Sequence, residues 1–263
     1  MPLEDDLPST EGRIPCLKPF WQNKYKATAG KNWNDFYKRN TTNFFKDRHW
    51  LDHEFPLLLT QPNMVGMEVG CGVGNLIYPA LERNESLTLF ACDFSETAVG
   101  FVKSNERYEP LHNDKRLEAF VSDITLPNPF APSIGPSTLD FITCIFVLSA
   151  IPPEKHVDCL RSFTEVMKDD GVICFRDYAA GDLAQLRFQK AREVPKLQDF
   201  LYVRQDGTMS YFFSEEYFRA IVAQVAGLHI EKLERIERRT KNIKRGLDEA
   251  RYFLQVVLCK KSL

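Results

Sequence analysis

The chain has 263 residues, of which 44% are hydrophobic and 27% are charged, and its formal net charge is −2. These are values of a globular protein with a sizeable core, and the overall charge alone gives no indication of a nucleic-acid partner. The acidic, proline-containing first 15 residues predict neither a signal peptide nor a presequence, and no stretch approaches the ~20 apolar residues of a membrane span.

Residues 1–60 are expected to form an extension in front of the main domain, with residues 1–17 flexible. From residue 20 to residue 59 the chain is rich in aromatic and basic residues, which favours helices and loops. Eight Lys or Arg residues stand against two Asp residues between Lys18 and Arg48, a local net charge of +6. Such a cluster is by default a solvated surface, but its aromatic neighbours favour a functional role.

The main domain, residues 61–263, alternates strand and helix patterns. Apolar runs predict strands at 64–70, 87–93, 117–123, 139–151 and 172–178. Helical patterns follow at 75–83, at 95–105 with Ser95 as the N-cap, and at 153–167 after a Pro-Pro pair. This alternation predicts a doubly wound α/β fold, in which a mostly parallel sheet carries helices on both faces.

The alternation breaks after the fifth strand. Residues 200–213 read as an inserted β-hairpin that turns at Asp206-Gly207. A helix at 215–226 and strands at 228–236 and 250–260 complete a seven-stranded sheet. Residues 237–249 are expected to form a mobile loop.

A glycine loop, EVGCGVGN (68–75), ends the first strand. Bare backbone at Gly70, Gly72 and Gly74 allows a ligand to approach the main chain, and the next helix points its N-terminus at the loop. A dinucleotide fingerprint would need a third glycine at position 75, where this chain has Asn75. Glu68 is also poorly placed for a pyrophosphate, whereas it suits a ligand with an amino group and a sulfonium charge. The loop therefore favours S-adenosylmethionine over a nicotinamide cofactor.

Two acidic residues follow the next two strands. Asp93 ends the second strand, where a carboxylate accepts hydrogen bonds from ribose hydroxyls, and Asp123 ends the third strand, within reach of an adenine amino group. Either residue alone could be a helix cap. Both together, in register with the glycine loop, indicate a cofactor site.

Seven scattered cysteines have no metal-ligand spacing, so no metal site is predicted. Their odd number fits a reducing compartment, the cytoplasm and also the nucleus.

Several segments together resemble the eukaryotic methyltransferase-like tRNA N3-methylcytidine methyltransferases. The resemblance spans residues 30–260 and rests on NWNDFYKRNTTNFFKDRHW (32–50), EVGCGVGN (68–75), ACDFS (91–95), FVLSAI (146–151), FRDY (175–178) and YVRQDGTMSYFF (202–213). It implies a class I, Rossmann-like methyltransferase fold and methylation of cytidine 32 in the anticodon loop of serine or threonine tRNAs. It further implies that S-adenosyl-L-methionine is held by Trp33, Tyr37, Gly70, Asp93, Asp123, Ile124 and Ile145.

The acceptor atom sets the chemistry. Cytosine N3 carries an in-plane lone pair and no proton, so the reaction needs positioning and electrostatics rather than a general base. The catalytic candidates are Arg176, Asp177 and Tyr178 after the fifth strand, and Arg204 and Asp206 on the hairpin. Secondary candidates lie nearby in the same motifs: Tyr211, Phe212, Phe44, Phe45, Asp47, Arg48 and His49. The alternatives are a structural Arg–Asp pair, core phenylalanines and a structural histidine.

A second basic segment, Lys232 to Arg245, has a net charge of +5 and supports an anticodon stem-loop as partner. An aminoacyl-tRNA synthetase such as seryl-tRNA synthetase is a further candidate partner, and no membrane contact is expected. Three alternatives stay open: a methyltransferase of a small molecule or protein, a non-catalytic tRNA-binding adaptor, and a nicotinamide dehydrogenase.

Overall fold

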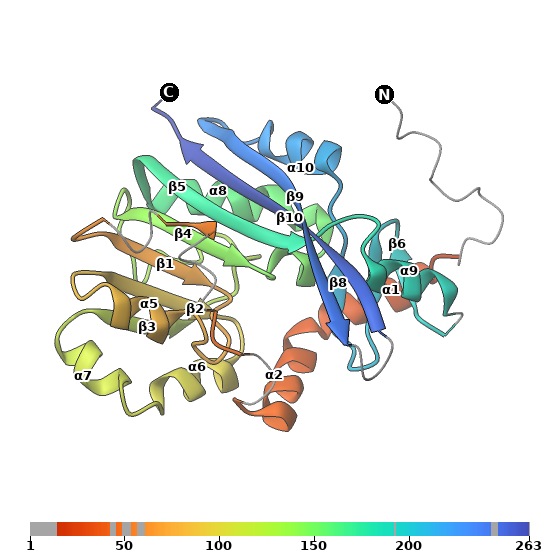
Figure 1. The fold of residues 1–263 in the computed structure, drawn as a ribbon, viewed down its shortest axis with the longest axis horizontal. Coiled ribbons are helices and arrows are strands. Elements are labelled where there is room, and N and C mark those ends of the chain that lie inside the picture. The colour runs from red at the N-terminus through yellow and green to blue at the C-terminus, as the bar shows by residue number, and fades with distance from the viewer. Residues whose placement is uncertain are drawn as a thin grey trace.

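The computed structural model describes residues 15–42, 46–48, 54–56, 61–191, 193–242 and 247–262. Within these residues the centre of the molecule is a seven-stranded sheet of order β3-β2-β1-β4-β5-β10-β9 (Figure 1). Its strands are β1 (Val65–Val69), β2 (Thr88–Asp93), β3 (Leu117–Val121), β4 (Leu139–Ile145), β5 (Met167–Tyr178), β9 (Leu228–Asn242) and β10 (Leu247–Lys260). The first five strands pair in parallel, and β10 is antiparallel to both β5 and β9. The predicted doubly wound, mostly parallel sheet is confirmed.

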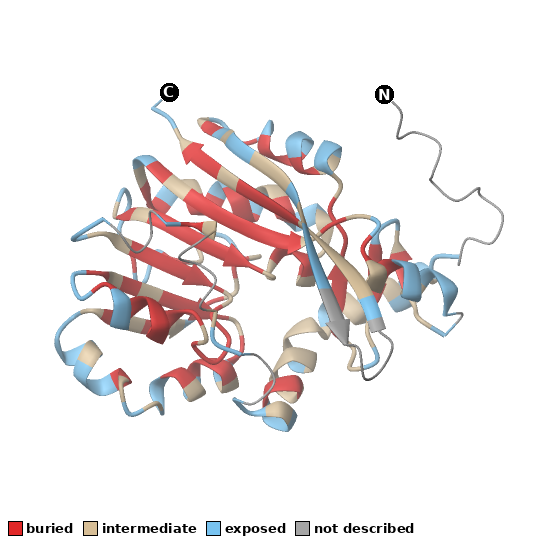
Figure 2. Cartoon of the chain, in the orientation of Figure 1, coloured by how far each residue is buried: buried red, intermediate tan, exposed pale blue. Residues whose placement is uncertain are grey.

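Helices cover both faces of this sheet. One face carries α5 (Ile77–Arg83), α6 (Glu96–Lys103) and α7 (Tyr108–Asn113), and the other carries α8 (His156–Val166) and α10 (Glu215–Val222). Side chains of β4 alternate between two apolar clusters, because successive residues of a strand point to opposite faces. Both sides of the central strands are therefore buried, as Figure 2 shows.

The segment after β4 departs from the predicted strand. The strand ends at Ile145 rather than at residue 151, because Phe146 adopts a left-handed conformation with φ of 60°. Two short 3-10 turns follow, η1 (Leu148–Ala150) and η2 (Pro153–Lys155), and they lead directly into α8. This loop therefore bends across the carboxyl end of the sheet.

An N-terminal helical extension and a small second sheet lie at that same end. The extension contains α1 (Pro19–Ala27) and α2 (Ala29–Asn40). The predicted hairpin is confirmed as β7 (Leu201–Val203) and β8 (Met209–Tyr211). It is joined by β6 (Lys196–Gln198), which is too short for a sequence signal, and it is preceded by α9 (Leu183–Lys190).

The prediction of a loop at residues 237–249 is wrong for residues 237–242 and 247–249, which are strands in the structure. The strands β9 and β10 stay paired as far as Asn242 and Leu247, and they leave the sheet as a two-stranded arm (Figure 1). Charged residues occupy both faces of this arm, so the sequence lacks the apolar alternation of a half-buried strand. Arg239 and Asp248 pair across it through two hydrogen bonds.

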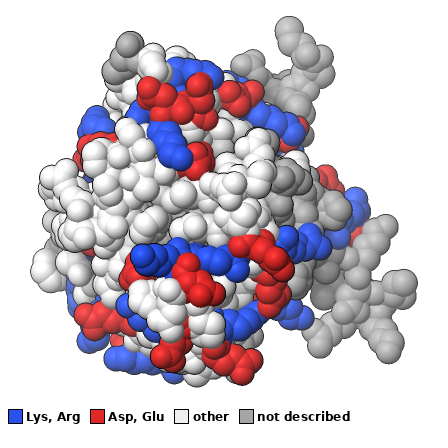
Figure 3. Space-filling model, turned by 90° about the vertical axis from the view of Figure 1, so that its left-hand side faces the viewer, with Lys and Arg blue, Asp and Glu red and all other residues white. Residues whose placement is uncertain are grey.

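Charge is mixed at the opposite end of the molecule. Figure 3 looks onto the amino ends of the parallel strands, where the middle of the face is mostly uncharged and basic and acidic side chains lie together above and below it. No helix in the described part of the chain is both long and apolar enough to span a membrane.

Candidate active site

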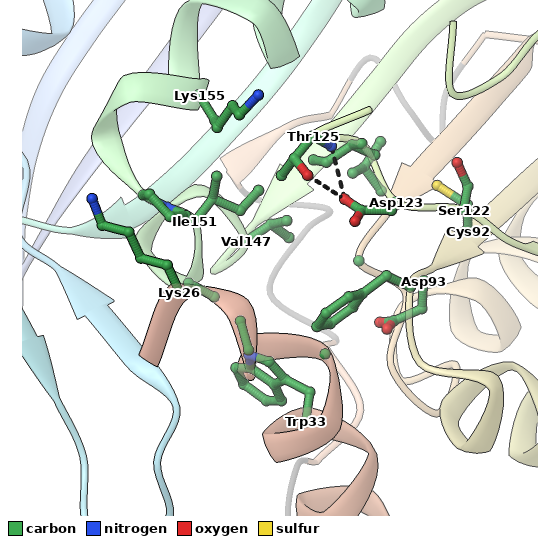
Figure 4. Close-up of a pocket in the computed structure, with 18 of the residues that line it drawn as sticks. Lys26, Trp33, Cys92, Asp93, Ser122, Asp123, Thr125, Val147, Ile151 and Lys155 are labelled. Atoms are coloured by element: carbon green, nitrogen blue, oxygen red, sulfur yellow. Dashed lines mark hydrogen bonds between the residues drawn. The ribbon is translucent and has the colours of Figure 1, made fainter. Parts of the chain in front are cut away.

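A cavity of about 460 Å³ lies at the carboxyl ends of β1, β2, β3 and β4. Its remaining walls come from α1, α2 and the loop after β4, as Figure 4 shows. Ligands of open α/β sheets bind in this position, where the loops after neighbouring strands meet. Six of the seven residues predicted to hold the cofactor line the cavity: Trp33, Tyr37, Gly70, Asp93, Asp123 and Ile124.

The seventh, Ile145, is buried in the core behind the cavity and is not among the lining residues. The next two residues, Phe146 and Val147, form that part of the wall instead. The turn at Phe146 brings them to the cavity. The apolar run at this point predicted a continuous strand and carried no signal of the turn.

The glycine loop owes its shape to two close approaches. Gly70 and Gly72 both have positive φ angles, of 63° and 53°. A Cβ atom on Gly70 would lie 2.5 Å from Val147, and one on Gly72 would lie 2.9 Å from the Tyr37 hydroxyl. Glycine is therefore required at both positions, by conformation and by space.

Helix α2 forms the wall opposite the sheet. Phe36 and Tyr37 are buried against Val73 of the glycine loop, with Trp33 packed beside them. The Asn34 side chain accepts a hydrogen bond of 2.6 Å from Ser95, the N-cap of α6. Burial, and next the nearby Asp93 carboxylate, raises the pKa of Tyr37, so its hydroxyl stays protonated.

Asp93 is held by the glycine loop and by the turn after β2. Its Oδ2 accepts a hydrogen bond from the Gly72 N–H at 3.0 Å, and its Oδ1 accepts one from the Ser95 N–H at 2.9 Å. Burial raises the pKa of Asp93 to about 6, although both bonds favour the charged form. Each carboxylate oxygen keeps a second lone pair for a ligand hydroxyl.

Asp123 lies across the cavity. Its Oδ1 accepts hydrogen bonds from the backbone N–H and the hydroxyl of Thr125, at 2.9 and 2.7 Å. Both bonds fix the carboxylate at the cavity wall (Figure 4). The cap-like hydrogen bonds expected for an acid at a strand end are thus present at both aspartates, and both still face the cavity.

A buried acid lies beneath the glycine loop. Glu68 is 2% exposed, and burial raises its pKa to about 8. Its Oε1 lies 3.7 Å from Nη1 of Arg48, and its Oε2 has no hydrogen-bond partner among the described residues. An incompletely paired acid beside a cavity fits a ligand with positive charge, as S-adenosylmethionine is.

The predicted catalytic residues after the fifth strand separate into two environments. Arg176 and Asp177 are buried at 3% and 0% exposure. Nη1 of Arg176 lies 3.6 Å from Oε1 of Glu54 and donates to Gln255 at 3.2 Å, whereas Asp177, the next residue of the strand, points to the opposite face of the sheet. Burial lowers the pKa of Arg176 to about 10.

Asp177 supports the loop after β4. Its Oδ2 accepts a hydrogen bond of 2.9 Å from the Ser149 N–H in η1, and its Oδ1 accepts one from the Tyr178 N–H. Burial raises its pKa to about 6, partly offset by these bonds and by the charge of Arg204. This carboxylate therefore lies behind the cavity wall and holds it in place.

Tyr178 belongs to a half-exposed aromatic cluster next to the cavity. Its ring lies 5.2 Å from Phe146, which lines the cavity, and 6.1 Å from Phe253. The guanidinium groups of Arg204 and Arg251 lie 5.4 and 5.7 Å from the Tyr178 ring centre. Aromatic faces and guanidinium groups are the usual partners of an unstacked base.

The hairpin reaches this site through α2. Asn32 donates a hydrogen bond of 2.8 Å to the carbonyl of Gly207, and the Asp206 carboxylate accepts two from Thr208 within the turn. Phe212 is buried, as the core alternative expected, and Tyr211 is buried as well. Phe44, Phe45 and His49 lie outside the described residues.

Two cavity residues had no signal in the sequence. Lys26 of α1 and Glu154 of η2 form an ion pair, and both line the cavity. They are 128 positions apart, so only the tertiary structure brings them together. Among the described residues, no group of three or more His, Cys, Asp or Glu side chains is arranged to hold a metal ion.

Comparison with known proteins agrees with this geometry. Residues 67–173 match the family model of a methyltransferase domain. A solved S-adenosylmethionine-dependent methyltransferase from Anabaena variabilis superposes with a TM-score of 0.65 at 14% identity, over 88% of this chain and 95% of that one. At that identity the likeness shows the fold.

Closer relatives define the family. The tRNA N(3)-methylcytidine methyltransferase of Schizosaccharomyces pombe is 44% identical, over 93% of this chain and 97% of that protein. The human tRNA N(3)-cytidine methyltransferase is 39% identical, over 91% of this chain and 83% of that protein. A dehydrogenase is thereby excluded, and the methyl donor is S-adenosyl-L-methionine. The chain belongs to the family of tRNA N(3)-cytidine methyltransferases.

Proposed function

We propose that this enzyme transfers the methyl group of S-adenosyl-L-methionine to N3 of cytidine 32 in the anticodon loop of serine or threonine tRNAs. A relative from Saccharomyces cerevisiae, 38% identical over 89% of this chain and 37% of that protein, is named a tRNA(Thr) (cytosine(32)-N(3))-methyltransferase. The observation that carries the proposal is the shared wall at Phe146. This residue lines the cofactor cavity on one side and packs against Tyr178 and Phe253 on the other.

The cofactor is assigned to the six predicted residues that line the cavity. Asp93 receives the ribose hydroxyls, Asp123 and Ile124 receive the adenine, and the backbone at Gly70 allows close approach of the amino-acid part. Trp33 and Tyr37 cover the ligand from α2. When bound, S-adenosyl-L-methionine supplies an electrophilic methyl group on a positively charged sulfur.

The acceptor base is assigned to the aromatic cluster. A cytosine drawn out of its stack gains contact with Phe146 and Tyr178, and stacking on an aromatic ring contributes about 1–3 kcal/mol. The guanidinium groups of Arg204 and Arg251 lie close enough to donate to the base carbonyl or to a flanking phosphate. The residues thus align N3 with the methyl group and exclude water, and no side chain has to remove a proton.

Asp177 acts through the loop that it supports. Its hydrogen bond to Ser149 fixes the wall between the two ligands. Its partial negative charge also stabilises the cationic product base at moderate range. Asp206 acts on the shape of the hairpin turn through Thr208.

The tRNA backbone is assigned to exposed basic side chains near the cavity. Lys38 and Arg39 lie on the last turn of α2, and Arg238 and Arg239 lie on the arm of β9 and β10. These elements flank the end of the sheet that holds the cavity (Figure 1). On the opposite face, which Figure 3 shows, the basic side chains of the described residues lie among acidic ones.

Three further features belong to the same proposal. Residues 1–60 act as an extension that serves substrate binding, and residues 61–263 form the catalytic domain. The protein acts in the cytoplasm and also in the nucleus, a location that its seven free thiols support. An aminoacyl-tRNA synthetase such as seryl-tRNA synthetase is a candidate partner in presenting the tRNA.

Mass spectrometry of tRNA nucleosides tests this function. Cells that lack the protein should lose 3-methylcytidine from serine or threonine tRNAs, and the wild-type chain should restore it. Restoration by the Asp93→Ala variant at wild-type levels, or unchanged 3-methylcytidine in the deletion, would contradict the proposal.

A further inference from the structure

The loop between β4 and α8 forms one wall of the cofactor cavity. Val147, Ala150, Ile151 and Pro152 all line the cavity. The loop is tied to β5 at its start, where the Phe146 N–H donates to the Arg176 carbonyl. Its other backbone hydrogen bonds are short-range ones within the two turns, from Ala150 to Val147, from Ile151 to Leu148 and from Lys155 to Pro152. Bonds within a turn do not fix the turn against its neighbours, so side chains from neighbouring elements must set the position of residues 147–152.

His156 holds this loop from below. It is the first residue of α8 and is fully buried. Its Nε2 lies 2.8 Å from the carbonyl oxygen of Leu148 and 3.0 Å from that of Ile151. Carbonyl oxygens only accept hydrogen bonds, so Nε2 carries the proton and donates to both.

The opposite nitrogen of the ring fixes that tautomer. Nδ1 of His156 lies 3.0 Å from the hydroxyl of Tyr217 on α10, and the Pro153 carbonyl oxygen lies 3.3 Å from the same hydroxyl. Because Nδ1 carries no proton and makes the shorter contact, the Tyr217 hydroxyl donates to it. Burial lowers the pKa of His156 to about 4, so the ring is neutral and needs this donor. The ring also packs against Tyr211 and Phe213, at 5.4 and 5.3 Å, which belong to the inserted sheet and the residues after it.

We propose that His156, oriented by Tyr217, is a positioning residue for methyl transfer: it fixes the 147–152 wall against the cofactor and links that wall to the inserted sheet. The inference rests on the cofactor site proposed above. Asp177 also holds the backbone of this loop, because its carboxylate accepts a hydrogen bond from the Ser149 N–H. The loop is therefore anchored both through its carbonyl groups and through an N–H.

Two substitutions at one position separate the donor from the ring. In His156→Gln the side-chain amide nitrogen reaches about as far as Nε2 and can donate to the Leu148 carbonyl. In His156→Asn the shorter amide reaches only the Nδ1 position, so the loop loses its donor. We expect His156→Asn to raise the Kd for S-adenosylhomocysteine and the KM for S-adenosylmethionine roughly tenfold, with the KM for tRNA unchanged. His156→Gln should stay within about twofold of wild type.

A hydroxyl pair supplies the control. Tyr217→Phe removes the donor to His156. Tyr108→Phe removes a hydroxyl that accepts a hydrogen bond of 3.4 Å from the Ala119 N–H of β3, and neither residue lines the cavity. Tyr217→Phe should raise the cofactor KM about threefold and Tyr108→Phe should not, at similar thermal stability. This pair decides the question if His156→Asn does not fold.

Two results would overturn the inference. Equal cofactor affinity in all His156 and Tyr217 variants would show that the ring only fills space, and equal impairment in His156→Gln and His156→Asn would exclude the donor role. Asp93→Asn, measured alongside, reports on the cofactor site itself. If Asp93→Asn also binds S-adenosylhomocysteine normally, the proposed cofactor site is wrong. If Asp93→Asn binds it weakly while the His156 and Tyr217 variants bind it normally, the cofactor site stands and only the proposed role of His156 is wrong.

Discussion

Replacing Asp93 with asparagine tests whether the protein holds a buried charge for its cofactor at the expense of stability. Burial raises the pKa of this carboxyl from 3.8 to about 6. At ~1.4 kcal/mol per unit, the ionised group disfavours the folded state by about 3 kcal/mol at neutral pH. Because the folded pKa is raised, the stability contributed by this group is present below pH ~4 and is lost as the pH rises through about 6.

The asparagine variant removes that penalty but spoils one backbone contact. One of the N–H groups of Gly72 and Ser95 then faces an amide nitrogen, which costs about 1–3 kcal/mol. The two effects nearly cancel, so the free energy of unfolding should change by no more than ~2 kcal/mol. A ligand hydroxyl loses a charged acceptor worth ~1.5–3 kcal/mol, so the Kd for S-adenosylhomocysteine should rise about 10- to 150-fold.

Asp140→Asn is the matched control. Asp140 accepts a hydrogen bond of 2.8 Å from the Val65 N–H and pairs with Lys168 at the opposite end of the sheet. Its replacement should lower stability and leave cofactor affinity unchanged. Titration calorimetry and denaturant unfolding measure both quantities. An unchanged Kd for Asp93→Asn, or a loss of stability well beyond that of Asp140→Asn, would refute the reasoning.

Three other predictions concern the acceptor side. Charge reversal of Lys38 and Arg39 should weaken tRNA binding and reduce the slope of log affinity against log salt by ~0.7–0.9 for each phosphate that the protein no longer neutralises, with cofactor affinity unchanged; an identical slope would make this surface irrelevant. Tyr178→Phe should keep most of the activity, whereas Tyr178→Ala should raise the KM for tRNA about tenfold by removing a stacking face; equal kinetics in both variants would contradict a stacking role. Asp177→Asn should lower the single-turnover rate about tenfold, because the negative charge is lost and one of the N–H groups of Ser149 and Tyr178 then faces an amide nitrogen, whereas Asp206→Asn should stay within about threefold; a larger loss in Asp206→Asn than in Asp177→Asn would place the important charge on the hairpin.

Local signals were sufficient to predict the sheet and the cofactor cavity. The apolar runs, the glycine loop and the acids at positions 93 and 123 are each recognisable from neighbouring residues, and they predicted β1 to β5 and the lining residues Gly70, Asp93 and Asp123. Trp33 and Tyr37 were assigned only through the family resemblance. Tyr37 belongs to the N-terminal extension and Gly72 to the glycine loop, and only the tertiary structure brings the two residues together.

The catalytic candidates were harder to assign for a related reason. Arg176 and Asp177 lie at the carboxyl edge of a strand, where ligands bind, so the sequence favoured direct contact with substrate. In the folded chain the η1 turn covers this edge, and the Ser149 N–H donates a hydrogen bond to the Asp177 carboxylate. The turn depends on the left-handed residue Phe146, for which an aromatic side chain is no signal. The role of His156 was likewise not predicted, because its partners are distant in sequence: the carbonyl groups of Leu148 and Ile151 precede it, and Tyr217 lies on a helix 61 positions after it.

The acceptor atom is the most direct test of the central claim. The purified enzyme, S-adenosylmethionine with a labelled methyl group and a serine-tRNA transcript form the assay, with 3-deazacytidine at position 32 of a matched transcript as the control. The deaza base keeps its shape and its amino group but carries C–H in place of the nucleophilic nitrogen. We expect the label in 3-methylcytidine from the first transcript and no transfer to the second. Equal labelling of both transcripts would show that the methyl group goes to another atom, and would contradict the assignment of this chain as an enzyme that methylates N3 of cytidine 32.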